Sequence, residues 1–194
     1  AFSYNPQAKI DAAGGNSVAS SFAWTVTSIT GGSVTGISSG DNGTANVAGT
    51  ANNISGSDAV ILYTITPTST TGSCVGTPFT ITVTVNSEPL GTNTTETVCS
   101  DEAFNYNPQA NIDAAGGNSI ASSFAWTVTS ITGGSITGIS SGDNGTANVA
   151  GTANNISGSD AVILYTITPT STTGSCVGTP FTITVTVNTE PLAT

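Results

Sequence analysis

The chain has 194 residues, 11 acidic side chains and a single cation, Lys9, and its formal net charge at pH 7 is −10. Nucleic acids and anionic membrane surfaces are bound by clusters of Lys and Arg, so this composition excludes both as partners. The longest apolar run, Ala59-Val60-Ile61-Leu62-Tyr63, is too short to cross a bilayer, so no membrane insertion is expected.

The chain contains two nearly identical copies of one sequence. Residues 1–92 match residues 103–194 at an offset of 102, and six positions differ: Ser3/Asn105, Lys9/Asn111, Val18/Ile120, Val34/Ile136, Ser87/Thr189 and Gly91/Ala193. A repeat of this length is large enough to have its own core. We expect a first repeat over residues 1–88, a linker over 89–92, a second, complete repeat over 93–190, and the start of a further linker at 191–194. The first repeat lacks the leading strand and its cysteine, which indicates truncation at its N-terminus.

The second copy shows the expected elements in chain order, beginning with short strands at residues 93–98 and 104–106. Asn107-Pro108 followed by Gly116-Gly117 is typical helix punctuation, which predicts one short helical turn over residues 109–115. Phe124, Trp126 and Val128 alternate with small or polar residues, which is typical of a strand with one buried face. The Trp at this position, Trp24 in the first copy and Trp126 in the second, is therefore predicted to anchor the core.

The remaining elements of the repeat are strands separated by turns. Residues 142–145 (Gly-Asp-Asn-Gly) carry a hairpin signal, and residues 146–153 read as a weak strand. A strong strand is predicted over residues 162–168, ended by Pro169. The last strand, residues 181–188, alternates apolar residues with threonine. About seven short strands per repeat and no long helix predict an all-β fold of two tandem immunoglobulin-like antiparallel sandwiches.

The three cysteines suggest one disulfide per complete repeat. Cys99 opens the second repeat and Cys176 lies near its end, so we expect a Cys99–Cys176 bridge, with Cys74 unpaired because its partner would precede residue 1. Spacing alone leaves two alternatives open: a Cys74–Cys99 bridge, or three free thiols. A structural disulfide would require an oxidising, extracytoplasmic location.

Residues for catalysis are missing from the sequence. The chain has no His, so neither a Ser–His nor a Cys–His pair can form, and we predict that the protein is not an enzyme. No cofactor is expected. The candidates for a metal site are Glu88, Asp101 and Glu102, whose carboxylates surround the linker in sequence and are of the type that Ca²⁺ prefers. No Asp-x-Asp-x-Asp-Gly loop supports them, so the alternative is that they are solvated turn and linker residues.

The order of motifs resembles a known family. Six segments of the second copy, taken in order, together resemble the PKD-like repeat. They are Val98-Cys99-Ser100-Asp101, Phe124-Ala125-Trp126-Thr127, residues 165–170 (Tyr-Thr-Ile-Thr-Pro-Thr), residues 174–178 (Gly-Ser-Cys-Val-Gly), the strand at 181–188 and Glu190-Pro191. This resemblance implies an immunoglobulin-like sandwich in tandem arrays of giant cell-surface adhesins of Bacteroidota, including those of gliding motility. It also implies an extracellular location at the cell surface.

Two hypotheses for function follow. The first is a structural spacer: repeats of a long surface filament involved in adhesion or gliding motility, whose partners are neighbouring near-identical repeats of the same chain. The second is a binding module in which each repeat contacts extracellular polysaccharide or a solid surface and gains affinity by multivalency. A large exposed aromatic or threonine-rich patch would favour the second hypothesis.

Overall fold

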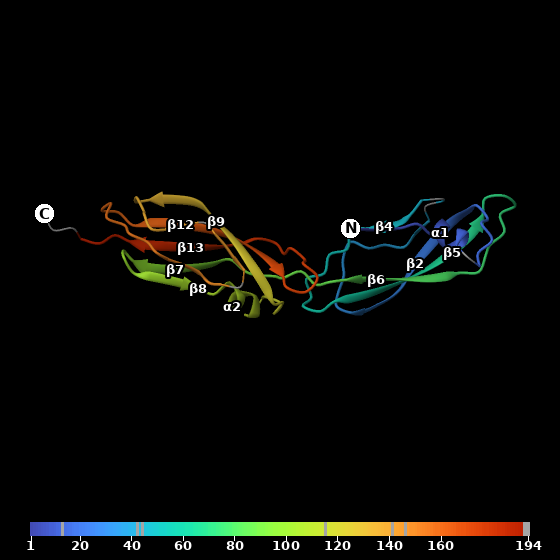
Figure 1. Ribbon diagram of the computed structural model, residues 1–194, viewed down its shortest axis with the longest axis horizontal. Coiled ribbons are helices and arrows are strands. Elements are labelled where there is room, and N and C mark those ends of the chain that lie inside the picture. The colour runs from blue at the N-terminus through green and yellow to red at the C-terminus, as the bar shows by residue number, and fades with distance from the viewer. Residues whose placement is uncertain are drawn as a thin grey trace. The chain divides into compact units, whose positions relative to one another are not determined.

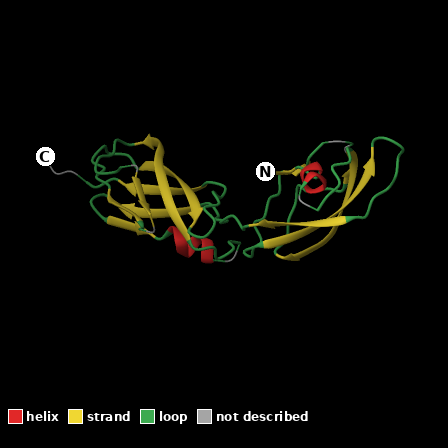
Figure 2. Ribbon diagram, turned by 45° about the vertical axis from the view of Figure 1, so that its right-hand side comes forward, coloured by secondary structure: helices red, strands yellow, loops and turns green. Residues whose placement is uncertain are grey.

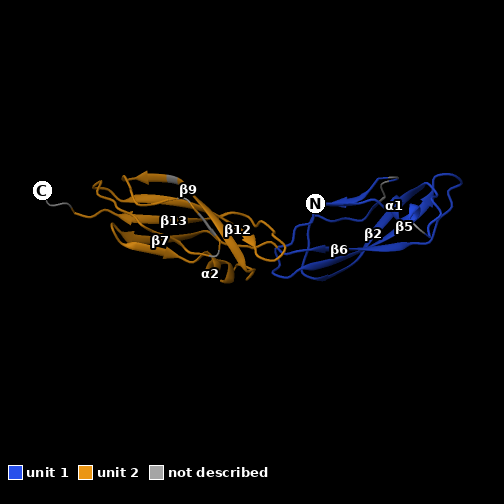
Figure 3. Cartoon of the chain, viewed as in Figure 1, with its two compact units in different colours: residues 1–87 blue, residues 88–194 orange. Residues whose placement is uncertain are grey.

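The structure is a computed structural model that describes residues 1–12, 14–41, 43, 45–114, 116–140, 142–145 and 147–191. It comprises two compact units, residues 1–87 (unit 1) and residues 88–194 (unit 2), coloured separately in Figure 3. Each unit consists of β-strands and one short helix (Figure 2). The predicted start of a further linker, residues 191–194, lies outside the described residues except for Pro191.

Unit 2 has a main sheet of five strands in the order β10-β9-β12-β13-β7 (Figure 1). Their bounds are β7 Thr94–Cys99, β9 Ser122–Gly133, β10 Gly142–Gly145, β12 Ala161–Ser171 and β13 Phe181–Asn188. Neighbouring strands are antiparallel, except that β13 and β7 run parallel over the whole length of β7. The first and last strands of the repeat therefore lie side by side and point in the same direction.

A second layer covers one face of this sheet. It consists of the strand pair β8 (Ala103–Tyr106) and β11 (Val149–Thr152) with the helix α2 (Pro108–Asp113). The helix begins at Pro108, one residue before the predicted start, because Asn107 caps it: its Oδ1 accepts hydrogen bonds from the backbone N–H groups of Gln109 and Ala110. Two layers around one apolar core make a sandwich.

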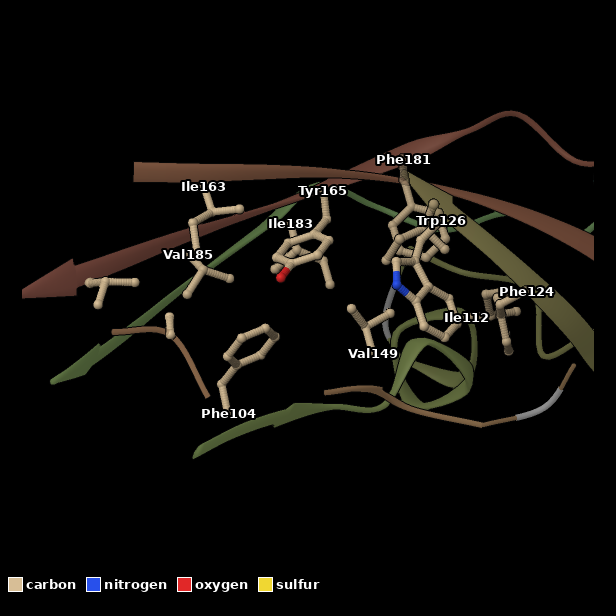
Figure 4. Packing of buried hydrophobic residues seen from close by; sticks show 13 residues of the cluster. Phe104, Ile112, Phe124, Trp126, Val149, Ile163, Tyr165, Phe181, Ile183 and Val185 are labelled. Carbon is tan, nitrogen blue, oxygen red and sulfur yellow. The ribbon is translucent and has the colours of Figure 1, made fainter. Parts of the chain in front are cut away.

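The core of unit 2 follows from the alternation in the sequence. Along β12 and β13 every second residue is buried, and the residues between them are partly exposed. In Figure 4, Tyr165, Ile183 and Trp126 point from the main sheet toward Phe104, Val149 and Ile112 of the second layer. Burial raises the pKa of Tyr165 to about 12, because the phenolate would lose its hydration there.

Both tryptophans lie in the cores, each with 6% of its surface exposed. A glycine covers each indole ring. A Cβ built on Gly142 would lie 3.0 Å from Cζ2 of Trp126, and one on Gly40 would lie 2.9 Å from Cζ2 of Trp24. Glycine is therefore needed at these two positions so that the neighbouring strand can approach the ring.

One expected strand end and one expected turn differ from the structure. Pro169 does not end its strand, since β12 continues to Ser171 and Pro169 pairs with Phe124 of β9. Residues 142–145 form strand β10, paired with β9 through an irregular register, and not a tight hairpin turn. The long partner β9 explains both differences, because it is twelve residues long and offers backbone groups to both segments.

Unit 1 repeats this arrangement with a smaller main sheet. Its strand order is β3-β2-β5-β6, with bounds β2 Ser20–Gly31, β3 Gly40–Asp41, β5 Ala59–Ser69 and β6 Phe79–Val85. The second layer is β1 (Phe2–Tyr4) paired with β4 (Val47–Gly49), next to α1 (Gln7–Asp11). Strand β6, the counterpart of β13, is at the edge of the sheet. The predicted fold class, tandem immunoglobulin-like β-sandwiches, is confirmed, with the parallel β13–β7 pair as an exception to antiparallel pairing.

Candidate functional site: the cradle of the leading segment

Residues 88–92 (Glu-Pro-Leu-Gly-Thr), here called the leading segment, are held against unit 2. Asn118, in the loop after α2, binds it with both ends of its side-chain amide. The N–H of Leu90 donates to Asn118 Oδ1 at 3.0 Å, and Asn118 Nδ2 donates to the carbonyl of Glu88 at 2.6 Å. One side chain thus satisfies a backbone donor and a backbone acceptor, as a neighbouring strand would.

A second amide repeats this arrangement two residues later. The N–H of Thr92 donates to Asn111 Oδ1 at 2.8 Å, and Asn111 Nδ2 donates to the carbonyl of Thr92 at 2.9 Å. Asn111 lies on α2 and is 9% exposed. Because its amide is buried and both of its ends are satisfied, the position of Thr92 is closely specified.

Two glycines allow the leading segment to approach. A Cβ on Gly91 would lie 2.5 Å from the ring of Phe181, and a Cβ on Gly178 would lie 2.1 Å from the carbonyl oxygen of Pro89. Any side chain at either position would require the neighbour to move. Together with Asn111 and Asn118, these contacts form the cradle of the leading segment.

The cradle positions the chain so that β7 begins in register with β13. Asn93 Oδ1 accepts a hydrogen bond from the N–H of Thr182 at 2.8 Å, next to the first paired residues, Thr94 and Ile183. The stretch expected to be a linker, residues 89–92, therefore belongs to the compact unit that begins at Glu88.

The chain leaves unit 2 at the opposite end of β13. There the N–H of Thr189 donates to Asp160 Oδ1 at 3.0 Å, and the N–H of Glu190 donates to the carbonyl of Asn155. Asn155 is fully buried and its Nδ2 donates to the carbonyl of Val187 at 2.9 Å. Because β7 and β13 are parallel, the two ends of the repeat lie at opposite ends of this strand pair.

The same geometry corrects the expected disulfide. Cys99 is in register with Asn188, whose neighbour Val187 pairs with Ala161, the first residue of β12. The carbonyl of Cys176 accepts from the N–H of Ser171, the last residue of β12. The two cysteines therefore lie beside opposite ends of β12, ten strand residues or roughly 30 Å apart. A disulfide needs Cα atoms within about 7 Å, so Cys99–Cys176 is excluded.

No disulfide joins any of the three cysteines, all of which lie within the described residues. Cys74 and Cys99 are exposed, and Cys176 is half-buried. The prediction failed because it assumed that the opening and closing residues of a repeat meet. That would hold for an antiparallel terminal pair, but a parallel pair places them at opposite ends.

The calcium candidates are not brought together. Glu88 precedes β7, whereas Asp101 and Glu102 follow it, so they lie at opposite ends of that strand. Asp101 Oδ1 accepts from Asn154 Nδ2 at 2.8 Å, and Glu102 Oε2 accepts from the N–H of Cys99 at 3.0 Å. Among the described residues, no group of three or more His, Cys, Asp or Glu side chains could hold a metal ion.

The residues of the cradle were missed at the level of sequence. Asn111 is one of the six positions that differ between the copies, with Lys9 as its counterpart, and this difference was the available signal. Asn118 has an identical counterpart, Asn16, so nothing in the comparison of the copies distinguished it.

A model of the PKD-like domain matches residues 1–89 and 96–191, which is most of the chain. No curated protein and no solved structure matches it. No helix in the described part of the chain is long and apolar enough to span a membrane. PKD-like domains are in general extracellular immunoglobulin-like modules with structural or adhesive roles, and they are typically non-catalytic. With both repeats matched, the chain belongs to the PKD-like domain family.

Proposed function

We propose that these repeats are tension-bearing structural spacers of a long extracellular surface filament, of the kind that serves adhesion or gliding motility. Near-identity of the two copies supports this, since a spacer uses the same mechanical unit many times. The leading segment also supports the proposal, because two side-chain amides bind this segment to unit 2.

The parallel pairing of β7 with β13 is the observation that carries the proposal. Tension applied at the two ends of unit 2 pulls β7 and β13 past each other. The hydrogen bonds of a parallel pair then share the load, and they must break together before the strands separate. A hairpin pulled at its open end would lose its bonds one at a time. Resistance to shear is the property that a filament repeat needs.

Stretching of single molecules tests this proposal. Thr182 directs its N–H toward β7, and backbone groups alternate between the two edges of a strand, so Thr184 also faces β7. In a parallel pair, Thr184 bonds to the neighbours of its partner Thr95, which include Glu96. Glu96→Pro removes that N–H and should lower the unfolding force of unit 2. Thr97→Pro is the matched control, because its N–H faces the outer edge of the sheet.

The result that contradicts the proposal is an unfolding force that Glu96→Pro leaves unchanged. The alternative, a binding module, is tested separately by a glycan array and by adsorption of the chain to solid surfaces. The burial of Trp24 and Trp126 removes the aromatic platform on which such binding would most simply rest. Saturable glycan binding, lost on substitution of exposed residues, would support the module instead.

A further inference from the structure

Unit 1 binds the backbone up to its last residue, Ser87. The N–H of Ser87 donates to Asp58 Oδ1 at 2.9 Å, and its Oγ accepts from the N–H of Gly56 at 3.0 Å. Thr189, the counterpart of Ser87, makes the same two hydrogen bonds in unit 2. Because both the N–H and the side chain of Ser87 are bound within unit 1, the φ torsion of this residue is fixed there.

Unit 2 binds the backbone from the very next residue. The carbonyl of Glu88 accepts from Asn118 Nδ2 at 2.6 Å. Pro89 is buried, and its carbonyl oxygen lies so close to Gly178 that a Cβ there would be 2.1 Å away. The peptide group that joins Glu88 to Pro89 is therefore fixed in unit 2, together with the rest of the leading segment.

Between these two fixed points lies one peptide group, the one that joins Ser87 to Glu88. Its orientation depends on ψ of Ser87 and on φ and ψ of Glu88. The proline that follows confines Glu88 to the extended region, so that ψ of Glu88 varies little. Within the described residues, the N–H of Glu88 makes no hydrogen bond. This peptide group is thus the point at which neither unit restrains the backbone.

We propose that the Ser87–Glu88 peptide is the hinge of the chain, so that reorientation of the two units is confined to ψ of Ser87 and φ of Glu88. Hinges in proteins are commonly a few residues at the ends of elements that absorb changes in φ and ψ. Residues 89–92, expected to be a linker, take no part while the cradle holds them. The inference is independent of the proposed spacer role, because it concerns bending and not resistance to shear.

The length of this hinge depends on the amide of Asn118. If that amide is removed, the next hydrogen-bonded backbone group of the leading segment is the N–H of Thr92, bound by Asn111. The backbone of residues 88–91 would then join the hinge. A longer flexible segment allows the two units more orientations than a single peptide group does. One side chain of unit 2 therefore sets how freely the chain bends at this point.

Residual dipolar couplings of the backbone amides, measured on the whole chain in a weakly aligning medium, locate the hinge. We expect the two units to fit alignment tensors of different magnitude, because they reorient partly independently. The coupling of Ser87 should fit the tensor of unit 1. The couplings of Leu90 and Thr92 should fit the tensor of unit 2.

Asn118→Ala should lengthen the hinge. In ¹⁵N relaxation, the order parameter of Leu90 should fall from about 0.85 to below about 0.6, whereas that of Thr92 should stay high. Couplings in β9 and β12 that still fit unit 2 would show that the variant is folded. Asn16→Ala is the matched control, because Asn16 is the counterpart of Asn118 in unit 1 and lies outside the cradle.

Two results on the parent chain would overturn the proposal. A single tensor that fits both units would mean that the junction does not bend. Couplings averaged to near zero from Leu90 to Thr92 would mean that the leading segment is itself a flexible linker. An order parameter of Leu90 that Asn118→Ala leaves unchanged would show that this amide does not set the length of the hinge.

Discussion

At the scale of single residues, two side-chain amides of unit 2 bind the backbone of the leading segment. Asn111 offers Thr92 one acceptor and one donor, as a paired strand would. Lysine, its counterpart in unit 1, offers donors only. Lys9 is exposed and Asn111 is buried, so the same helix position serves a different purpose in each unit.

Asn111→Lys should lower the free energy of unfolding of unit 2 by about 1–3 kcal/mol, because the buried amide that binds both backbone groups of Thr92 is lost. Denaturant unfolding in a Trp24→Phe background measures this, since Trp126 then reports on unit 2 alone. Ala110→Lys is the control, because it adds the same side chain at an exposed position of the same helix. Equal effects of the two substitutions would contradict the assigned role of the amide.

The thiols give a second prediction at this scale. The strand register keeps Cys99 and Cys176 about ten residues apart along β12, so we expect no internal disulfide. Alkylation of the unfolded chain without reductant should add three groups, and prior reduction should not change the intact mass. A peptide linking Cys99 to Cys176 would show that the strand register is wrong.

Tyr165 predicts the response of unit 2 to alkali. Its pKa is raised to about 12 by burial, above the ordinary value of about 10. Because the unfolded state releases its proton first, the stabilisation is complete below pH 10 and is lost as the pH rises toward 12. Unfolding measured across this range should show the decline, and Tyr165→Phe should reduce it. A flat profile in the parent chain would contradict the burial of the hydroxyl.

At the scale of elements, the sequence predicted strands well and their neighbours poorly. Alternation of apolar residues with threonine is a local property, so the strands at 124–128, 162–168 and 181–188 are found within β9, β12 and β13. The pairing of β7 with β13 joins residues about 90 positions apart in the sequence, and no local pattern encodes its direction. The disulfide prediction failed at this step. The cradle was missed for the same reason, since Asn111 and Asn118 became recognisable only once Thr92 and Leu90 lay beside them.

The contribution of burial to stability can be compared between two equivalent isoleucines, one in each unit. Ile183 in β13 is fully buried, whereas its counterpart Ile81 in β6 is partly exposed. Ile183→Ala should cost unit 2 about 2–5 kcal/mol, within the range for buried isoleucine. Ile81→Ala should cost unit 1 clearly less, because part of that side chain is already in water. Equal costs would mean that the edge of β6 is covered in solution.

At the scale of the whole molecule, two nearly identical sequences form sheets of different size. Unit 2 has five strands in its main sheet and unit 1 has four. Only six residues distinguish the copies, and the additional strand in the main sheet of unit 2 is β7, which pairs with β13. In unit 2, the segment that precedes the core therefore completes the main sheet.

For a chain of these 194 residues, we expect unit 1 to unfold at a lower denaturant concentration than unit 2, because β6 is paired on one side only among the described residues. Covering the four apolar side chains of β6 as fully as those of β13 would stabilise unit 1 by on the order of 4 kcal/mol. Each unit contains one tryptophan, so Trp126→Phe leaves Trp24 to report on unit 1 with its core intact, and Trp24→Phe does the reverse for unit 2. Two fluorescence transitions, with unit 1 first, are expected. Coincident transitions would contradict this expectation.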